Sequence, residues 1–405
     1  MMYQAYQAHS DLMWPLRTLS KLSIPLLQDP GFGLSNWPAT RHIAAACKVL
    51  ELSAVTHARP AWRIDSVEVK GQACPVQEEA VLTTPFATLL RFRKEGISNQ
   101  PKVLVVAPMS GHFATLLRDT VRTALQDHDV YVTDWHNVRD VPLEAGRFGL
   151  DEYTAHIIDF LAAMGPRSNV IAVCQPCVAA LAAVALMSED EHPATPASLT
   201  LMAGPIDCRI NPTAVNILAT TKSIEWFKTN LISTVPWQHA GAGRSVYPGF
   251  VQLSAFISMN KDRHANAFKE YYQHIVDDEF DKVEVTRTFY EEYMAVADLA
   301  ADFYLETVRL VFQEYALPKG ELMFRGRRVN PAAIRRTALL TVEGERDDIC
   351  AVGQTLAAQD LASSLRPYMR KHYMQPNVGH YGVFSGKRWQ QHVYPLVRDL
   401  IQISQ

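Results

Sequence analysis

The stretch that decides the fold of this sequence is Val170-Ile171-Ala172-Val173-Cys174-Gln175-Pro176-Cys177. Its apolar start predicts a buried strand, and the alanine-rich segment from Val178 to Met187 that follows predicts a helix. Cys174 therefore stands on a sharp strand-to-helix turn, which lifts its side chain out of the sheet. The helix directs free N–H groups and a positive dipole end toward the sulfur, which favours thiolate over thiol.

The composition is that of an ordinary globular protein. The chain has 405 residues, a hydrophobic fraction of 48%, and 39 basic against 42 acidic residues. The length predicts one large core with an insertion, and the balanced charge argues against a nucleic-acid partner. The segment from Met1 to Ile24 lacks the uninterrupted apolar run of a secretory signal, and no later stretch is apolar enough to span a bilayer. Six cysteines without framework spacing fit a reducing compartment, so we expect a cytoplasmic protein.

Short apolar runs along the chain predict a central sheet. Three runs that follow a helical N-terminal region predict strands with antiparallel pairing: Trp62 to Val69, Val76 to Leu82 and Ala87 to Arg93. Later runs alternate with helical segments, as buried parallel strands do: Val103 to Ala107, Val130 to Thr133, Val170 to Val173, Leu199 to Met202, Ala338 to Val342 and His372 to Met374.

Between Cys208 and Asn330 the strand signals stop. The segment from Val283 to Tyr315 carries apolar residues at helical spacing, Val296 and Ala300 among them. We therefore expect three parts: residues 1–207 with the N-terminal helical region and the first part of the core, 208–330 as a helical lid insertion, and 331–405 completing the core.

The remaining members of a nucleophilic site follow Cys174 along the chain. The strand from Ala338 to Val342 leads into Gly344-Glu345-Arg346-Asp347-Asp348, where a carboxylate can hold an imidazole, and we select Asp347 with Asp348 as its rival. The loop Asn377-Val378-Gly379-His380-Tyr381-Gly382 supplies the histidine. The chain order of nucleophile, acid and histidine is that of an α/β-hydrolase, with a mostly parallel central sheet flanked by helices.

Two backbone N–H groups are the predicted donors to an oxyanion. One belongs to Gln175, the residue after the nucleophile, and the other to Met109 in the loop Pro108-Met109-Ser110-Gly111-His112. Donors aimed at a developing charge are often the largest single contribution to catalysis. His112 and His136 are interpreted as packing residues.

Several stretches resemble the intracellular poly(3-hydroxybutyrate) depolymerases over the whole chain. They are Cys174-Gln175-Pro176, Gly204-Pro205-Ile206-Asp207, Asn211 to Asn216, Arg244 to Phe250 and Gly379 to Gly386. The resemblance implies hydrolysis of amorphous storage polyester on bacterial granules, with Cys174, Asp347 and His380 as nucleophile, acid and base. We expect no cofactor. Cys177 is a departure, because the family is not expected to require cysteine there.

Alternatives remain open at several positions. Cys174 and Cys177 form a C-x-x-C that could act as a redox pair, and Cys174 could be a structural core cysteine. Trp226, Trp237, Tyr247 and Phe250 either contact polyester or form the core of the lid. No His, Cys or carboxylate cluster has metal-ligand spacing.

Two other functions compete with depolymerisation. A polyhydroxyalkanoate synthase uses the same three residue types, but its elbow resembles G-x-C-x-G, whereas Ala172 and Pro176 flank Cys174 here. A granule-associated protein without catalytic activity is the rival from another class. Whether water or coenzyme A accepts the acyl group, and whether the chain forms homo-oligomers, is left open.

Overall fold

The sheet at the centre of the molecule has the predicted mixed character. The computed structural model describes residues 2–28 and 37–405, with only the backbone of Gln28. Within them a nine-stranded sheet has the order β1-β2-β3-β5-β4-β6-β7-β13-β14. Its strands are β1 (Ser66–Val69), β2 (Gln72–Thr83), β3 (Ala87–Lys94), β4 (Lys102–Val106), β5 (Asp129–Trp135), β6 (Ser168–Val173), β7 (Ser198–Met202), β13 (Ala338–Gly344) and β14 (Arg370–Gln375).

Pairing divides this sheet into two parts. β1, β2 and β3 pair antiparallel in sequence, and β3 pairs antiparallel with β5. From β5 to β14 every neighbouring pair is parallel. The predicted antiparallel start and parallel continuation are both confirmed.

The first predicted strand is shorter than the sequence suggested. Trp62 to Asp65 lies outside β1, whose first residue is Ser66. Trp62 is fully buried with its ring edge-on to Phe92, and its carbonyl accepts a hydrogen bond from the Arg118 guanidinium at 2.6 Å. The Trp62 carbonyl thus bonds a side chain, whereas Asp65, next to β1, still accepts from Val76 N of β2 at 2.9 Å.

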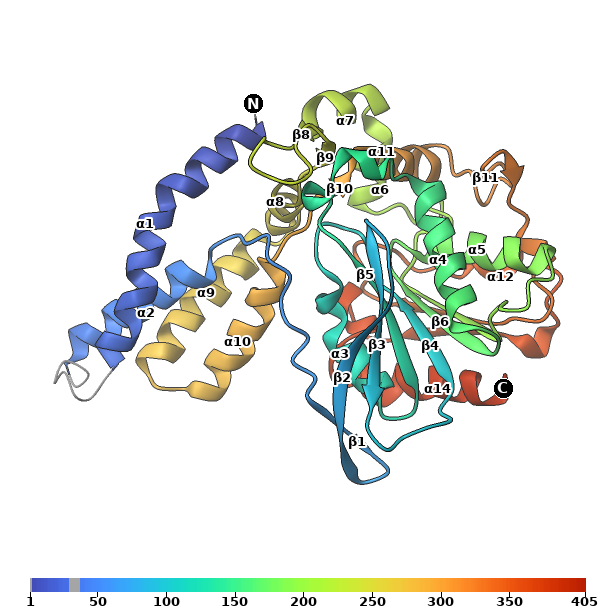
Figure 1. Cartoon of the computed structure of the whole chain (residues 1–405), viewed down its shortest axis with the longest axis horizontal. Coiled ribbons are helices and arrows are strands. Elements are labelled where there is room, and N and C mark those ends of the chain that lie inside the picture. The colour runs from blue at the N-terminus through green and yellow to red at the C-terminus, as the bar shows by residue number, and fades with distance from the viewer. Residues whose placement is uncertain (1, 29–36) are drawn as a thin grey trace.

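Helices cover the parallel strands in two packed pairs (Figure 1). α4 (Leu150–Met164) contacts α5 (Cys177–Glu189), and α3 (Arg118–Ala124) contacts α14 (Tyr394–Ile403). The residues of α5 are buried from Cys177 to Met187, so this helix is apolar on every side, as expected of a helix inside a core. The short helices α12 (Ala357–Leu361) and α13 (Gly386–Arg388) complete the C-terminal part.

The insertion lies between β7 and β13. Its helices are α6 (Ala214–Thr221), α7 (Ile224–Leu231), α8 (Gly249–Met259), α9 (Lys261–Val276), α10 (Phe280–Tyr293) and α11 (Ala301–Thr307), which continues into a π-helical turn at Val308–Gln313. It also holds a small sheet of order β10-β9-β8 and a hairpin of two short strands. These strands are β8 (Ser233–Thr234), β9 (Ser245–Tyr247), β10 (Leu299–Ala300), β11 (Met323–Phe324) and β12 (Arg327–Arg328).

The predicted helix from Val283 to Tyr315 is interrupted. α10 ends at Tyr293, and the following residues form strand-like contacts: Ala295 bridges to Thr56, Val296 bridges to His112, and β10 pairs with β9. Val296 and Ala300 are buried as their spacing suggested, but in an extended segment. The helical prediction was wrong here because tertiary pairing outweighs local periodicity.

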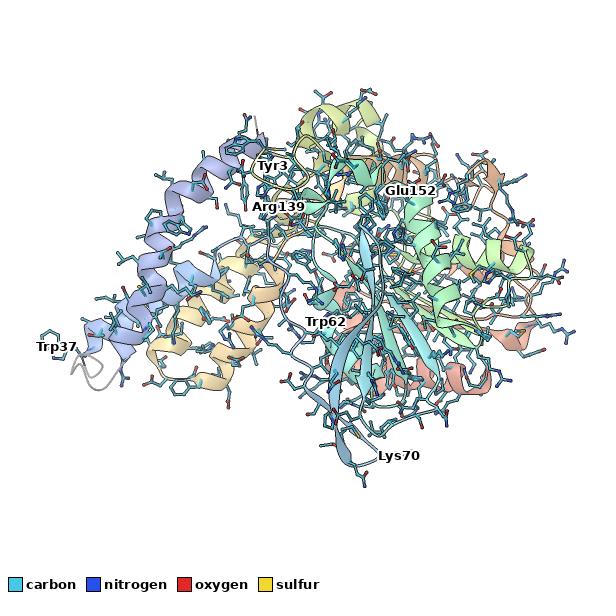
Figure 2. The ribbon with its side chains drawn as sticks, viewed as in Figure 1. Tyr3, Trp37, Trp62, Lys70, Arg139 and Glu152 are labelled. Atoms are coloured by element: carbon cyan, nitrogen blue, oxygen red, sulfur yellow. The ribbon has the colours of Figure 1, made fainter. Side chains whose placement is uncertain are left out.

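The N-terminal helix α1 (Met2–Gln28) extends along the side of the molecule with α2 (Pro38–Leu52), α9 and α10 (Figure 1). Its first turn is anchored, because the Tyr3 hydroxyl donates to the buried Asp298 carboxylate at 2.6 Å. Figure 2 shows Tyr3 close to Arg139 at this end of the helix. None of the helices in the described part of the chain combines enough length with enough apolar character to cross a bilayer.

Candidate active site

Cys174 occupies the sharp turn predicted between β6 and α5. Its φ angle is 68°, in the left-handed region that residues with a Cβ rarely adopt. Its N–H donates to Met202 O at 2.7 Å, which ties the turn to β7, and its carbonyl accepts from Cys177 N at 3.1 Å. Strained backbone of this kind persists where the surrounding structure holds it, and it is concentrated at functional sites.

The turn is packed closely against Gly204. A Cβ at Gly204 would lie 2.2 Å from Cys177 Cβ and 3.2 Å from the Cys174 carbonyl oxygen, so only glycine fits. Cys177 is fully buried, with its thiol directed at Ala172 O at 3.3 Å. Burial raises the pKa of the Cys177 thiol well above its ordinary value, with a smaller contribution from the charge of Cys174. These features favour the packing interpretation of Cys177.

Asp347 and His380 meet as the chain order suggested. His380 Nδ1 lies 2.8 Å from Asp347 Oδ2, and both residues are buried. The other carboxylate oxygen of Asp347 accepts from the N–H groups of Ile349 and Cys350, each at 2.9 Å. Asp348 is exposed. The geometry therefore favours Asp347 over its rival as the partner of the imidazole.

His380 also interacts with the thiol of Cys174. Burial alone would lower the pKa of His380, but the charges of Cys174 and Asp347 and hydrogen bonds to both raise it well above its ordinary value. These influences favour the charged form of the imidazole over the neutral form. The structure thus brings together the three side chains selected from the sequence.

The loops that carry Asp347 and His380 are joined to each other. Arg346 N donates to Val378 O at 2.9 Å, and Asn377 N donates to the Glu345 carboxylate at 2.7 Å. The acid loop is further held by Glu343, a carboxylate buried in β13, which accepts from the N–H groups of Gly353, Thr355 and Leu356. Sequence reasoning missed Glu343, although an acidic residue inside an apolar strand was a visible signal.

Thr355 extends this support to the turn at Cys174. Its hydroxyl donates to Gly204 O at 3.0 Å and accepts from Gly204 N at 2.8 Å. Gly204 is the residue that packs against the Cys174 turn, so the acid loop and the turn share one framework. The positions of Cys174 and Asp347 are therefore coupled through the hydroxyl of Thr355 and the packing of Gly204.

The predicted oxyanion loop follows β4, and hydrogen bonds hold it at Ala107 and at Met109. Trp135 and Tyr153 donate to Ala107 O at 2.8 and 3.0 Å, which holds the start of the loop. Met109 is buried, and its N–H donates to the side-chain oxygen Oε1 of Gln175 at 3.3 Å. Two backbone donors, on Met109 and Gln175, therefore come from residues in direct contact.

The insertion covers this loop. Ala297 N donates to Gly111 O at 3.0 Å, and the ring Nε2 of His112 donates to Tyr293 O at 3.0 Å. Burial lowers the pKa of His112 to about 4, so its ring is neutral, as expected of a packing histidine. Burial raises the pKa of Tyr381, with smaller contributions from the charges of Tyr293 and Cys174. Residues of the insertion thus contact the loop that carries Met109.

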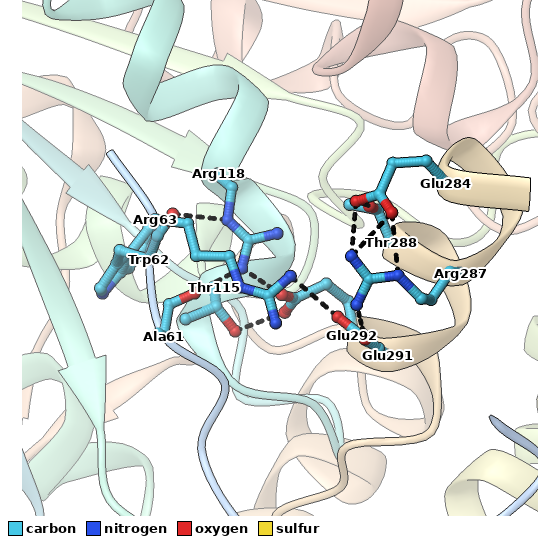
Figure 3. Close-up of polar contacts among 10 residues, drawn as sticks. All are labelled: Ala61, Trp62, Arg63, Thr115, Arg118, Glu284, Arg287, Thr288, Glu291 and Glu292. Carbon is cyan, nitrogen blue, oxygen red and sulfur yellow. Dashed lines mark hydrogen bonds and ion pairs between the residues drawn. The ribbon is translucent and has the colours of Figure 1, made fainter. Parts of the chain in front are cut away.

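A polar network fastens α10 of the insertion to the core (Figure 3). Glu292 is buried and pairs with Arg118 at the start of α3, while the Thr115 hydroxyl donates to the same carboxylate at 2.6 Å. Arg63 pairs with Glu291 at 2.9 Å. Because His112 bonds to the carbonyl of the next residue, Tyr293, this network helps to hold the oxyanion loop.

Glu292→Gln is expected to lower the free energy of unfolding by about 3 kcal/mol, because it leaves the Arg118 guanidinium without its buried counter-ion. Urea denaturation of the variant measures the change. The matched control is Glu284→Gln on the exposed side of α10, which removes a surface pair with Arg287 and should cost less than about 1 kcal/mol. Equal losses in the two variants would contradict the role assigned to Glu292.

The four aromatic residues proposed from the sequence for substrate contact differ in exposure. Tyr247 is buried and stacks on Tyr304 with ring centroids 3.9 Å apart, and Phe250 is buried and stacks on Tyr6 at the same separation. Their placement favours the lid-core interpretation. Trp237 is 88% exposed in the loop between β8 and β9, and Trp226 on α7 is half-buried.

Two other predictions concern residues away from Cys174, Asp347 and His380. His136 packs elsewhere, with its ring nitrogens bonded to Thr88 and Pro85. In residues 2–28 and 37–405, no three His, Cys, Asp or Glu side chains are arranged to hold a metal ion.

The topology and the turn at Cys174 define the class of protein. The parallel strands with β4 and β5 exchanged in order, the strand-turn-helix that carries Cys174, and the insertion after β7 are those of an α/β-hydrolase. Residues 203–405, half of the chain, match the family model described as PHB de-polymerase C-terminus. The chain therefore belongs to this family, and it is a hydrolase.

Solved structures of low identity also match. A 2-hydroxy-6-oxo-6-phenylhexa-2,4-dienoate hydrolase from Rhodococcus sp. strain RHA1 is 12% identical, with 81% of this chain and 99% of that chain covered and a TM-score of 0.44. A monoacylglycerol lipase from Paleococcus ferrophilus is 13% identical, with 76% and 97% covered and a TM-score of 0.42. Among curated proteins, no sequence matches.

Proposed function

We propose that this protein cleaves the ester bonds of amorphous poly(3-hydroxybutyrate) inside the cell, with Cys174 as nucleophile. The observation that carries the proposal is the imidazole of His380, bonded to Asp347 on one side and interacting with Cys174 on the other. Membership in the PHB de-polymerase family supports a polyester as the substrate. No observation favours the synthase or the non-catalytic alternative.

The proposed reaction is acyl transfer in two steps. The thiolate of Cys174 attacks the ester carbonyl, a carbon–sulfur bond forms, and the electron pair moves onto the carbonyl oxygen at the N–H groups of Met109 and Gln175. The tetrahedral intermediate expels the alkoxide of the polymer chain, which takes the proton of His380. Water then attacks the thioester, His380 removes its proton, and the acid leaves as the thiol is restored. Asp347 holds the imidazole in the required orientation throughout.

The test is incubation of the protein with amorphous poly(3-hydroxybutyrate) granules and mass spectrometry of the released products. The expected products are 3-hydroxybutyrate or its short oligomers. A parallel reaction with 3-hydroxybutyryl-coenzyme A measures polymer formation, and polymer growth without acid release would assign the chain to the synthases. Addition of free coenzyme A to the granule reaction shows whether a thiol replaces water as acyl acceptor, because the product is then a coenzyme A thioester.

Trp237→Ala is expected to weaken binding to amorphous granules several-fold and to leave hydrolysis of a soluble short ester unchanged. The indole is 88% exposed, and a large exposed aromatic gains favourable burial when it contacts an apolar polymer. Granule co-sedimentation and a soluble-ester assay measure the two effects. Trp37→Ala, which removes another exposed indole beside α2, is the matched control and should bind granules normally. Loss of binding in the control alone would move the contact surface to the N-terminal helices.

A further inference from the structure

The predicted oxyanion hole contains the side chain of Gln175, one of the two residues expected to supply its backbone donors. Met109 is only 6% exposed, and its N–H donates to Gln175 Oε1 at 3.3 Å. A buried N–H without an acceptor is costly, so this contact satisfies a donor that would otherwise be unpaired. Gln175 is half-buried, and among the described residues no acceptor for its Nε2 is found.

This contact competes with the chemistry of the site. The Met109 N–H has one hydrogen to donate, and during acyl transfer the carbonyl oxygen of the substrate needs it. The amide oxygen of Gln175 is itself a carbonyl oxygen, with the same preference for an N–H donor. While it remains bonded to Met109, one of the two donors is occupied.

We propose that the side chain of Gln175 occupies the oxyanion hole of the resting enzyme in place of the substrate's carbonyl oxygen and is displaced when an acyl group binds. The inference rests on the proposed function of Cys174. The backbone N–H of Gln175 stays in place in the turn before α5 while its side chain rotates, so this residue supplies one donor and controls access to the other. Gln175 is thus a positioning residue, since its side chain acts through the Met109 N–H.

Displacing the Gln175 side chain from Met109 costs free energy, and this cost lowers the affinity of the wild-type enzyme for an acyl group. When only a fraction of the protein has a free hole, apparent affinity falls by that fraction. A single neutral hydrogen bond, such as the one to Met109, is strong enough to lower the population with a free hole, and with it the affinity, by about 2- to 10-fold. Removing the side-chain amide of Gln175 should therefore raise the affinity by this factor. Loss of a merely structural contact would not raise the affinity.

The probe is 3-hydroxybutyraldehyde, an aldehyde of the size of one polymer unit. The thiolate of Cys174 adds to its carbonyl carbon, a carbon–sulfur bond forms, and the oxygen receives the electron pair without any leaving group. Reversible inhibition of ester hydrolysis by the aldehyde reports on the affinity of the hole. Gln175→Leu keeps the bulk and removes the acceptor, so its inhibition constant is expected to fall by about 2- to 10-fold. Gln175→Glu places a charged acceptor on Met109 and should raise the constant by about 10-fold or more.

A second readout is independent of turnover. The Met109 amide resonance in a ¹H–¹⁵N NMR spectrum should move in Gln175→Leu, and adding the aldehyde to the wild-type protein should move it as well. An unchanged inhibition constant in Gln175→Leu together with an unchanged Met109 resonance would overturn the inference. Failure of the proposed function looks different, because the aldehyde would then bind Cys174→Ala as well as it binds the wild-type protein.

Discussion

Cys174→Ala is expected to lower the release of 3-hydroxybutyrate from amorphous granules by on the order of 10⁵-fold. Alanine keeps the backbone of the turn but removes the sulfur that would carry the acyl group, so the two-step route is closed. The donors of the oxyanion hole remain, and they account for any residual rate above the uncatalysed reaction. Mass spectrometry of the products at matched protein concentration measures the loss.

Cys177→Ala is the matched control for this loss. It removes a thiol three residues away that is fully buried against Gly204 and directed at Ala172 O. Its expected effect is a lower melting temperature with activity close to wild type. A fully active Cys174→Ala, or an inactive and folded Cys177→Ala, would remove Cys174 from the role of nucleophile.

Cys174→Ala should also change the titration of His380. The charge of Cys174 and its hydrogen bond are among the influences that raise the pKa of His380. Without the sulfur, the imidazole pKa should fall toward or below its ordinary value, because burial then opposes the charged form. An NMR titration of His380 in wild type and variant measures this directly.

The central sheet could be predicted from the sequence because its signals are local. β6, from Ser168 to Val173, is buried at every position, and a short unbroken apolar run is what a central parallel strand requires. An unbroken apolar run is unfavourable when it is exposed to water, so it marks a buried strand, and the strand positions were found to within a few residues. The alanine-rich α5 was recognisable for the same reason.

The interruption of the insertion could not be predicted in this way. The residues from Met294 to Ala300 are all apolar apart from Asp298, and such a run fits a buried helix as well as it fits an extended segment. Asp298 N donates to Asn137, and its carboxylate accepts from Tyr3 and Gly249, which all come from distant parts of the chain. The spacing of apolar residues in a short stretch of sequence carries no information about hydrogen bonds to distant residues.

At the candidate site, the residues with proposed roles could be predicted from the sequence. The position of the Gln175 side chain could not. Chain order and loop position selected Asp347 and His380, which the structure places 2.8 Å apart. The contact between Met109 N and Gln175 Oε1 joins residues 66 positions apart and depends on one rotamer. No spacing rule indicates which side chain occupies a hole formed by two loops.

Asp347→Asn is the variant with the second largest expected effect, a loss of kcat on the order of 10²- to 10⁴-fold. The carboxylate accepts the Nδ1 proton of His380, and asparagine can present an N–H donor there, which favours the wrong tautomer. Loss of the negative charge and of the hydrogen bond also removes two of the influences that hold the His380 pKa above its ordinary value.

The pH dependence follows with a definite sign. A histidine whose pKa is raised in the folded enzyme stays protonated up to that pKa, so the imidazolium needed to protonate the departing alkoxide is lost only as pH rises through it. The fall of kcat/KM at alkaline pH should therefore shift to lower pH in Asp347→Asn. The control is Asp348→Asn, an exposed neighbour, with an expected change of less than about two-fold and an unshifted profile. An inactive Asp348→Asn beside an active Asp347→Asn would transfer the role to Asp348, against the 2.8 Å contact that supports Asp347.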